Sequence, residues 1–354
     1  MRENDPASVE RWIEGAVSRS LDGKVTAITA IKGDASARRF WRVRLEANSA
    51  TGVPISAIAI DLGPDDLPLY ARVLGLVRER LAEPPWLNVQ SFLKTIGVGV
   101  PEVYAADASA RMLLVEDVGE MPLFNAAEQG DAGDIYRLAI DELLVMHIEG
   151  TRRIGTDCLA ASIAYDERLF HYELQEFIEY GLPEVAPSIE GKAIAPELDQ
   201  VANELGTIPR VFSHRDYHGH NLFLQTRADT GLILRVIDFQ DALMAPSAQD
   251  LAVLLTTRDT SRFISERVEQ RLLDYYFAGY LRRGAEAFLT FDQFMMSYWL
   301  CVLQHALKVI GRFIKLERQG KAGYAAFIPY ALEQARRSLG RLDRMPQLRA
   351  ALLP

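Results

Sequence analysis

Cysteine and long apolar runs are scarce in this chain of 354 residues. Its two cysteines, Cys158 and Cys301, are too few and too far apart for a disulfide framework or a four-ligand zinc site, so we expect both to be buried as small apolar side chains. No apolar run reaches the roughly 18 residues that a membrane-spanning helix needs. The N-terminus, MRENDPASVERW, is charged where a signal peptide has an apolar stretch. We therefore expect a cytoplasmic protein with no membrane partner.

Basic charge is also in the minority, with 39 Lys and Arg against 48 Asp and Glu, a formal net charge of −9. This balance argues against a dedicated nucleic-acid-binding protein, because neutralising phosphates requires a basic face. Hydrophobic residues make up 49% of the chain and charged residues 25%. Such a composition predicts a globular protein with one large domain or two ordinary ones.

The first half has the patterns of strands and the second half those of helices. Strands are expected within residues 24–45, with a break at 33–36, and within 54–63, 100–107 and 111–119; a helix is expected at 66–82. These segments predict an antiparallel sheet of about five strands carrying one helix. Helical periodicity then dominates residues 134–148, 165–182, 195–206, 264–283, 293–316 and 327–342, interrupted by short apolar segments at 210–214, 221–225 and 231–239. A domain boundary is expected after Gly119.

A polar stretch, HRDYHGHN at 214–221, lies between two of these apolar segments. It contains Asp216 and, five residues later, Asn221, while Asp238 ends the apolar segment that follows. Carboxylate and amide oxygens at strand ends suit a hard cation such as Mg²⁺. The combination suits phosphoryl transfer: Asp216 would accept the proton of an attacking hydroxyl, and Asn221 and Asp238 would hold magnesium on the phosphates of a nucleotide.

The same stretch contains His214, His218 and His220, which raises the alternative of a zinc site. His214 and His218 would share a face only on a helix, whereas the flanking residues have the pattern of strands, so we do not favour zinc. We expect His214 to be a packed histidine that hydrogen-bonds the backbone and supports the loop. His218 and His220 are either solvated or in contact with phosphate or substrate.

HRDYHGHN together with VIDFQDALMAPSAQDLAVLL is similar to the catalytic and metal-binding segments of the aminoglycoside phosphotransferase and choline kinase superfamily. The resemblance implies an α+β, protein-kinase-like fold of two lobes. Residues 1–119 would form the nucleotide-binding lobe with a small antiparallel sheet, and residues 120–354 a mainly helical lobe with the catalytic loop and the substrate site. It also implies ATP and Mg²⁺ as cofactors, Asp216 as the catalytic residue and Asn221 and Asp238 as metal ligands. Asp250 would support the catalytic loop or, alternatively, cap the helix that follows.

On the nucleotide side, KGDASARRFWRV occupies the place of the phosphate-covering loop. The resemblance assigns Gly33, Ala35 and Ser36 to this loop, where small residues let backbone amides approach phosphate. LLVEDVG resembles the hinge, where the backbone from Glu116 to Val118 would bind adenine.

One departure from the pattern is the absence of a lysine in the third strand, where Ile60 and Asp61 stand. We hypothesise that Arg38, Arg39 or Arg42 replaces it. Alternation along a strand places Arg38 and Arg42 on one side and Arg39 on the other. The rival hypothesis is a catalytically inactive, nucleotide-binding scaffold.

Nearly the whole chain resembles the bacterial cell-wall-recycling kinases that phosphorylate N-acetylmuramic acid and N-acetylglucosamine at the anomeric hydroxyl. That subgroup also has an acidic residue after its third strand, and a late Gly-Lys-Tyr-like element that corresponds here to Gly320, Lys321 and Tyr324. The resemblance implies a small sugar as partner and ATP as phosphoryl donor. The alternative is a kinase of an aminoglycoside, a choline-like molecule or another small alcohol.

Several residues are candidates for binding the sugar: Glu173, Asp241, His218 and Arg312. Glu173 lies among aromatic residues, where it could bind sugar hydroxyls or form a local salt bridge. Arg312 and Lys315, one helical turn apart, could meet a carboxylate or coat a solvent-exposed face. We expect the aromatic group Tyr275, Tyr276, Tyr280, Tyr298 and Trp299 to pack between helices.

Overall fold

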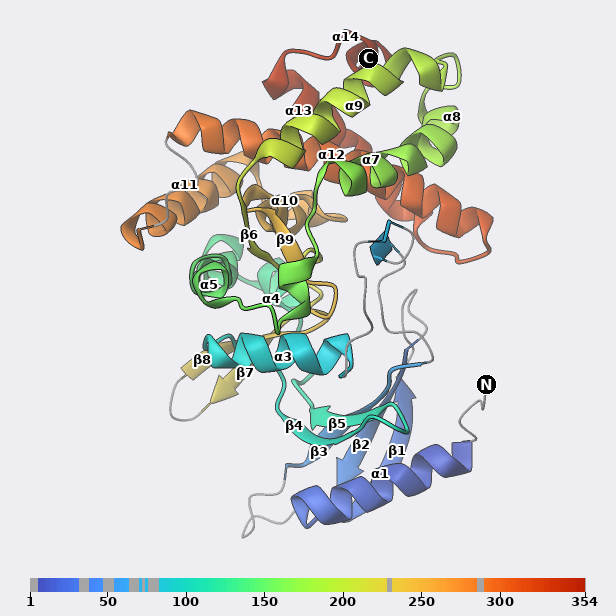
Figure 1. Ribbon diagram of the computed structural model, residues 1–354, viewed down its shortest axis with the longest axis vertical. Coiled ribbons are helices and arrows are strands. Elements are labelled where there is room, and N and C mark those ends of the chain that lie inside the picture. The colour runs from blue at the N-terminus through green and yellow to red at the C-terminus, as the bar shows by residue number, and fades with distance from the viewer. Residues whose placement is uncertain are drawn as a thin grey trace.

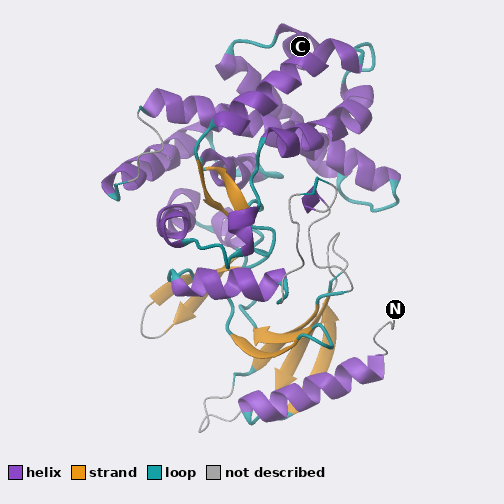
Figure 2. Ribbon diagram, viewed as in Figure 1, coloured by secondary structure: helices purple, strands orange, loops and turns teal. Residues whose placement is uncertain are grey.

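The structure is a computed structural model, which describes residues 6–31, 38–46, 54–63, 70–71, 74–75, 83–227, 231–284 and 290–353. A five-stranded sheet lies at one end of the molecule and most helices gather at the other (Figures 1 and 2). The α+β kinase-like fold predicted from the sequence is confirmed by this arrangement. The predicted phosphate loop, with Gly33, Ala35 and Ser36, and most of the predicted helix at 66–82 lie outside the described residues.

The sheet is antiparallel, with strand order β1-β2-β3-β5-β4, as the alternation predicts. Its strands are β1 Val25–Ile31, β2 Arg39–Leu45, β3 Ser56–Asp61, β4 Val103–Asp107 and β5 Met112–Glu116. Successive side chains of a strand point to opposite faces. Ala57 and Ala59 accordingly belong to a small core on one face, while Ile58 and Ile60 pack in the main core on the other.

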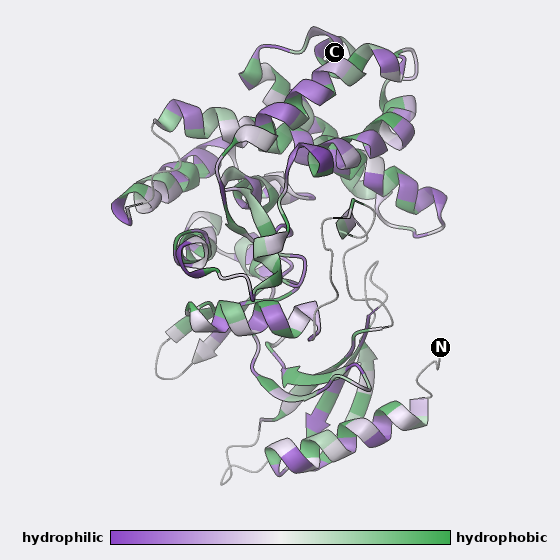
Figure 3. Cartoon of the chain, in the orientation of Figure 1, coloured by the Kyte–Doolittle hydropathy of each residue, from purple (hydrophilic) through white to green (hydrophobic). Residues whose placement is uncertain are grey.

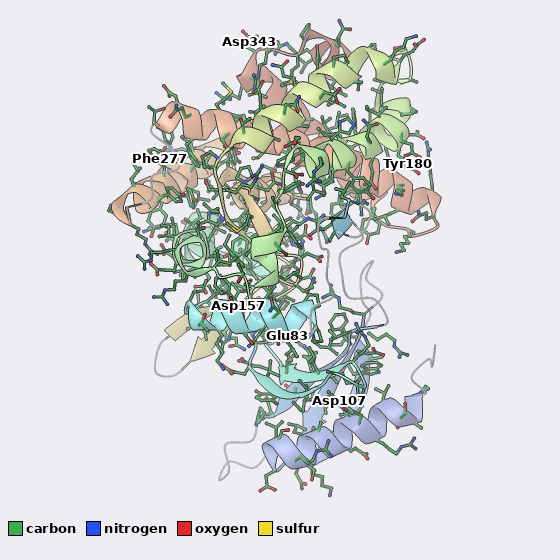
Figure 4. The ribbon with its side chains drawn as sticks, viewed as in Figure 1. Glu83, Asp107, Asp157, Tyr180, Phe277 and Asp343 are labelled. Atoms are coloured by element: carbon green, nitrogen blue, oxygen red, sulfur yellow. The ribbon has the colours of Figure 1, made fainter. Side chains whose placement is uncertain are left out.

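Helix α1, Pro6–Leu21, covers the small-core face of the sheet and was missed in the sequence (Figure 1). It buries Val9, Ile13, Ala16 and Val17, a helical spacing. Figure 3 shows apolar and polar residues interleaved along this helix. The Trp12 indole N–H donates to Asp107 of β4 at 3.2 Å, near the lower end of the sheet where Figure 4 labels Asp107. The signal was present, but the segment was considered only as a possible leader.

Helix α3, Pro85–Thr95, joins the sheet region to the helical region and was also not predicted. Its Trp86, Val89 and Leu93 belong to the main core together with residues of many later helices. Asn88 fixes it further, because its side chain donates to the Asp157 carbonyl at 2.8 Å and accepts from the Leu159 amide at 2.7 Å.

Most of the remaining helices correspond to predicted segments, with boundaries that shift by a few residues, whereas residues 123–129, 151–153 and 346–352 form helices that were not predicted. Together, these helices are α4 Leu123–Gln129, α5 Ala132–Val145, α6 Thr151–Arg153, α7 Glu167–Glu176, α8 Leu182–Val185, α9 Gly191–Thr207, α10 Ala248–Thr256, α11 Glu266–Arg282, α12 Phe291–Arg318, α13 Ile328–Leu342 and α14 Pro346–Leu352. Helices α5 and α7 continue into π-helical turns at Met146–Gly150 and Phe177–Gly181. Thr290 and Gln293 form a capping box that starts α12.

Helix α12 is the long central helix of the main core, in contact with α7, α10 and α13. The buried positions of Tyr276, Tyr280 and Tyr298 confirm that these tyrosines form core, and Cys158 and Cys301 are buried as predicted. No helix among the described residues combines the length and apolar character that crossing a membrane requires.

Two short two-stranded sheets lie between the five-stranded sheet and the helices. One pairs β6 Arg210–Ser213 with β9 Leu243–Pro246, and the other pairs β7 Leu222–Arg227 with β8 Gly231–Val236. Their connections contain HRDYHGHN and the residues after Asp238, so these two pairs of strands position the candidate site.

Candidate active site

The pairing of the short strands brings the two polar connections together. Residues 214–221 lead from β6 to β7, and residues 237–242 lead from β8 to β9. Ser213 pairs with Leu243, and Leu222 pairs with Val236. The Ile237 amide then donates to the Asn221 carbonyl at 3.0 Å, one step beyond the hairpin. The connections therefore start and end side by side, although they are separated by a hairpin in sequence.

Asp250 of α10 is the buried anchor of the first connection. Its carboxylate accepts from the backbone amides of His214 at 2.9 Å and Arg215 at 2.8 Å, and His147 Nε2 lies 3.1 Å from the same group. The contacts confirm that Asp250 supports the loop. The alternative of a helix cap is wrong, since Ser247 occupies the N-cap position.

His214 joins the two connections, as predicted for a supporting histidine. Its side chain is buried, and Nε2 lies 2.9 Å from the Ile237 carbonyl, a contact in which the imidazole must donate. Tyr217, also fully buried, donates to the Ala139 carbonyl at 2.8 Å and ties the loop to α5.

Two site residues adopt left-handed backbone conformations, Arg215 with φ 75° and Asp238 with φ 63°. Such conformations cost roughly 1 kcal/mol or more for residues other than glycine and concentrate at functional sites. Arg215 directly precedes Asp216, and Asp238 is itself one of the candidate metal-binding residues. The fold therefore holds these residues in a specific geometry.

Asp216 presents a half-buried carboxylate that accepts no hydrogen bond from the described residues. Burial by itself raises the pKa of this carboxyl, but the positive charges of Arg215 and Lys308 outweigh it and hold the pKa below its usual value. Asp216 is therefore ionised at neutral pH and available to accept a hydrogen bond from an incoming hydroxyl.

Asn221 and Asp238 offer oxygen atoms beside Asp216. Asn221 Nδ2 donates to the Asp216 carbonyl at 3.0 Å, which leaves Oδ1 without a partner among the described residues. Asp238 Oδ1 accepts from Arg38 Nη2 at 2.9 Å and from Gln240 at 3.1 Å. An amide oxygen and a carboxylate paired with a cationic group fit the donor set that Mg²⁺ prefers.

The zinc alternative finds no support in the positions of the histidines. Within the described part of the chain, no group of three or more His, Cys, Asp or Glu residues is arranged to hold a metal ion. His220 stacks on Phe124 with ring centroids 4.3 Å apart. His218 Nε2 lies 3.4 Å from Asn221 Nδ2, and burial, followed by the charge of Arg258, lowers the pKa of His218 to about 4.

The three candidate arginines have different partners. Arg38 reaches Asp238 across the space between the sheet and the helical region. Arg39 pairs with the buried Asp61 at 2.6 Å. Arg42 pairs with Asp117 at 2.9 Å and with Glu120. Of the three, Arg38 is thus the one in contact with the predicted metal-binding residues.

The predicted hinge follows β5. Glu116 has its amide bonded to the Glu102 carbonyl at 2.8 Å, and its side chain accepts from Arg235 of β8 at 3.1 Å. The Val118 amide has no hydrogen-bond partner within the described residues. The Glu116 side chain therefore links the sheet to the β7–β8 hairpin, and the Val118 backbone is available to a ligand.

Glu173 of α7 lies at the centre of a buried charged network that includes Arg215, the residue before Asp216. Its side chain is 1% exposed; Oε1 lies 3.0 Å from Arg215 and 3.1 Å from Lys308, and Oε2 accepts from Tyr165 and from Gln304 at 3.1 Å. Although burial raises the pKa of Glu173, Lys308 and Arg215 lower it to about 2. The carboxylate is fully occupied with holding two cations near Asp216.

Asp241 and Tyr70 are the remaining members of the charged network around Arg215. Arg215 lies over the Tyr70 ring, 4.1 Å from its centroid, and the Tyr70 hydroxyl donates to the Asp241 carbonyl at 3.2 Å. Arg215 Nη1 is 3.9 Å from the Asp241 carboxylate. Burial raises the pKa of Asp241, an effect that Arg215 partly offsets.

Arg312 lies one turn beyond Lys308 on α12. Its Nε donates to Glu176 at 2.6 Å, and Lys315 binds the other oxygen of the same carboxylate at 3.0 Å. Of the predicted substrate residues, Glu173 and Asp241 thus share Arg215, which directly precedes Asp216, whereas Arg312 lies with Glu176 one turn further along α12.

Residues 27–289 match the model of a phosphotransferase enzyme family, APH. This chain belongs to that family. It is 30% identical to the N-acetylmuramate/N-acetylglucosamine kinase of Caulobacter vibrioides over 85% of this chain and 84% of that protein, and 28% identical to the kinase of the same name from Pseudomonas aeruginosa over 75% of each. Its fold is similar to that of a choline kinase from Cryptosporidium parvum, with a TM-score of 0.60, 13% identity, and coverage of 98% of this chain and 100% of that one.

Three parts of this phosphotransferase's site were not predicted from its sequence: Arg215, Lys308 and Tyr70. Lys308 had a recognisable signal, because it stands inside the apolar helical pattern of LQHALKVI, where a buried lysine needs a partner. Arg215 lies within HRDYHGHN but was not assigned a role. Tyr70 had no signal, since its contacts come from segments more than 140 residues away.

Proposed function

We propose that this phosphotransferase uses ATP to phosphorylate the anomeric hydroxyl of N-acetylmuramic acid and N-acetylglucosamine, as a step of peptidoglycan recycling. The main support is that relatives at 27–30% identity over most of the chain have the name N-acetylmuramate/N-acetylglucosamine kinase. An ionised Asp216 beside two further oxygen donors agrees with this proposal, because phosphoryl transfer depends on alignment and charge stabilisation.

In this proposal ATP binds between a nucleotide lobe, residues 1–119, and a helical lobe, residues 120–354. The backbone from Glu116 to Val118 would bind adenine, and Gly33, Ala35 and Ser36 would cover the phosphates. Asn221 and Asp238 would hold Mg²⁺, which when bound neutralises charge on the phosphates. Arg38, already on Asp238, would supply the positive charge that the third strand lacks.

Asp216 orients the anomeric hydroxyl and accepts its proton as the new bond to phosphorus forms. Its low pKa makes it a weak base, so its contribution is mainly to position the attacking oxygen. On the substrate side we assign Asp241, His218 and Arg312 to contacts with the sugar. Glu173 would act through Arg215 and Lys308, because its own oxygens are already hydrogen-bonded.

The decisive experiment is phosphorus NMR of the product made from each sugar with ATP and Mg²⁺. A sugar 1-phosphate gives a signal coupled to the anomeric proton, and we expect that signal with N-acetylmuramate or N-acetylglucosamine. Asp216→Asn should lower kcat by about a thousandfold, within the range that a positioned acid or base contributes, with ATP affinity retained.

A coupled assay with choline and kanamycin provides the comparison substrates. If the protein phosphorylates choline or kanamycin in preference to the sugars, the proposed substrate is wrong. ATP binding without turnover of any acceptor would indicate the inactive scaffold instead.

A further inference from the structure

Helices α7 and α12 face each other with two successive groups of opposite charges. The inner tier consists of Glu173 and Lys308, and the outer tier consists of Glu176, Arg312 and Lys315. Glu173 and Glu176 are three residues apart, and Lys308 and Arg312 four apart, so each helix repeats its charge on one face after about one turn. The outer tier therefore repeats the inner one about one turn further along both helices.

The inner tier has unused hydrogen-bonding capacity next to the reacting group. The side chain of Lys308 is only 10% exposed, yet its three N–H donors have one partner among the described residues, Glu173. Its neighbour Arg215, which binds the same Glu173 oxygen, has a buried Nε without a partner in the described part of the chain. A buried ammonium in this state suits an acceptor group on a bound molecule.

In the outer tier, the Arg312 guanidinium is held in place by one hydrogen bond and keeps N–H donors that have no partner among the described residues. Glu176, with a side chain 7% exposed, binds Arg312 only through Nε, so Nη1 and Nη2 have no partner among the described residues while the side chain remains 40% exposed. Two cations share one carboxylate, which leaves the tier with net positive charge. A guanidinium held by one edge offers its other edge for bidentate binding of a carboxylate.

Close contact between the two helices sets this geometry. A Cβ on Gly311 would lie 2.4 Å from the backbone carbon and oxygen of Glu176, so only glycine permits this approach. A π-helical turn, Phe177–Gly181, follows Glu176, and it brings Tyr180 under Lys315, whose Nζ lies 5.4 Å from the ring centroid. Figure 4 labels Tyr180 at this end of α12. Such turns are frequent at functional sites.

We propose that the outer tier is the subsite for an anionic substituent of the acceptor, and that the inner tier binds the neutral acetamido carbonyl common to both sugars. This inference rests on the proposed function. With the anomeric hydroxyl at Asp216, the acetamido group on the adjacent ring carbon lies nearest to Lys308. The lactyl carboxylate, attached one carbon further along the ring, extends outward, and one turn of α12 separates Lys308 from Arg312 by about 6 Å.

The test compares kcat/KM for N-acetylmuramate and N-acetylglucosamine in Arg312→Gln, Lys315→Gln and Lys308→Gln. The two outer variants should lower the ratio of muramate to glucosamine efficiency by about tenfold or more, the effect of losing a charge-assisted hydrogen bond. Arg312→Lys should recover only part of the ratio, because it restores charge but not the planar fork. Lys308→Gln should lower both efficiencies together and leave the ratio unchanged.

Arg318→Gln is the matched control. Arg318 lies on the same helix and has the same charge, but it pairs with Glu184 at the surface, with side chains 47% and 55% exposed. It should leave both efficiencies unchanged. Each outer variant's turnover of N-acetylglucosamine shows that the variant is folded.

The possible failures are distinguishable. If the wild type phosphorylates both sugars and the outer variants keep the wild-type ratio, the subsite assignment is wrong while the proposed function stands. The same holds if Arg318→Gln changes the ratio as much as Arg312→Gln does. A wild type that phosphorylates neither sugar overturns the proposed function and this inference with it.

Discussion

Asp216 shows how closely charges are balanced around a single residue of this protein. Its carboxylate is ionised because Arg215 and Lys308 outweigh the effect of burial, and those two cations are held in turn by Glu173. A buried ion pair contributes little net stability compared with apolar residues, whereas an unpaired buried charge is strongly destabilising. The network is therefore better explained by its place beside the reacting group than by a contribution to folding.

Arg38 is the arginine that we expect to replace the missing lysine. Arg38→Ala should lower kcat/KM for ATP by about tenfold or more, because the guanidinium that binds Asp238 at 2.9 Å would be lost from the site. Steady-state kinetics at varied ATP concentration measures the effect.

Arg39→Ala is the matched control, since Arg39 is the next residue but pairs with Asp61 on β3. We expect it to change kcat/KM for ATP by less than about twofold, because the partner of Arg39 is Asp61 and not a predicted metal-binding residue. If the two variants lose kcat/KM for ATP to the same extent, the effect comes from removing any positive charge in this region and not from Arg38 in particular.

At the scale of elements, the contact between α7 and α12 depends on Gly311. Gly311→Ala should lower the free energy of unfolding by about 1–3 kcal/mol, the usual cost of overpacking, because its Cβ would meet the Glu176 backbone at 2.4 Å. Urea unfolding followed by circular dichroism measures this change.

Gly340→Ala in α13 provides the comparison, because a Cβ there has nothing within 4 Å. That substitution should raise stability by about 0.5 kcal/mol, since alanine favours the helix. Equal effects of the two substitutions would mean that the helices separate easily at Gly311.

Periodicity predicted most elements because local sequence sets which face of a helix or strand is apolar. The five strands of the sheet and helices α5, α7, α9, α11, α12 and α13 were found in this way. Helix α1 was missed although Val9, Ile13, Ala16 and Val17 have helical spacing. Helix α3 was missed although Pro85 suits the first turn of a helix and Trp86, Val89 and Leu93 have helical spacing. Strand β9, of four residues, is too short for alternation to be recognised.

At the scale of the whole molecule, burial of titratable groups predicts how stability depends on pH. The pKa of Glu173 falls from 4.5 to about 2 despite burial, because of Lys308 and Arg215. A carboxyl with a lowered pKa in the folded state contributes stability above pH 4.5, and that contribution is lost as pH falls toward 2.

His305 also makes the folded state less stable as pH falls, but over a different pH range. Burial, followed by the charge of Lys308, lowers its pKa from 6.5 to about 3, so the unfolded chain takes up a proton that the folded chain excludes. Stability should therefore begin to fall below pH 6.5 and fall further below pH 4.5.

Unfolding by urea at a series of pH values tests both effects. Glu173→Gln should lessen the decline below pH 4.5, where His305 still takes up its proton, and His305→Gln should lessen the decline that begins at pH 6.5, to which His218 also contributes. A wild type with constant stability from pH 7 to 4 would contradict the assigned burial of His305.

The sequence by itself determined most of the elements and the chemistry of the central residues. Asp216, Asn221 and Asp238 could be found because they lie within two short segments, each at the end of an apolar strand, and because their oxygen donors suit one kind of reaction. His214 and Asp250 were identified for the same reason, since their contacts join neighbouring parts of those segments.

Only the tertiary structure decided which charged side chains surround that centre. Lys308 with Glu173, Arg312 and Lys315 with Glu176, and Arg38 with Asp238 are pairs that lie more than 130 residues apart. No local pattern specifies such a pair, because an arginine or glutamate that is exposed on a helix occurs in the same kind of local sequence as one that is buried and paired. The packing of α12 against α7, and of the sheet against the hairpins, selects each partner.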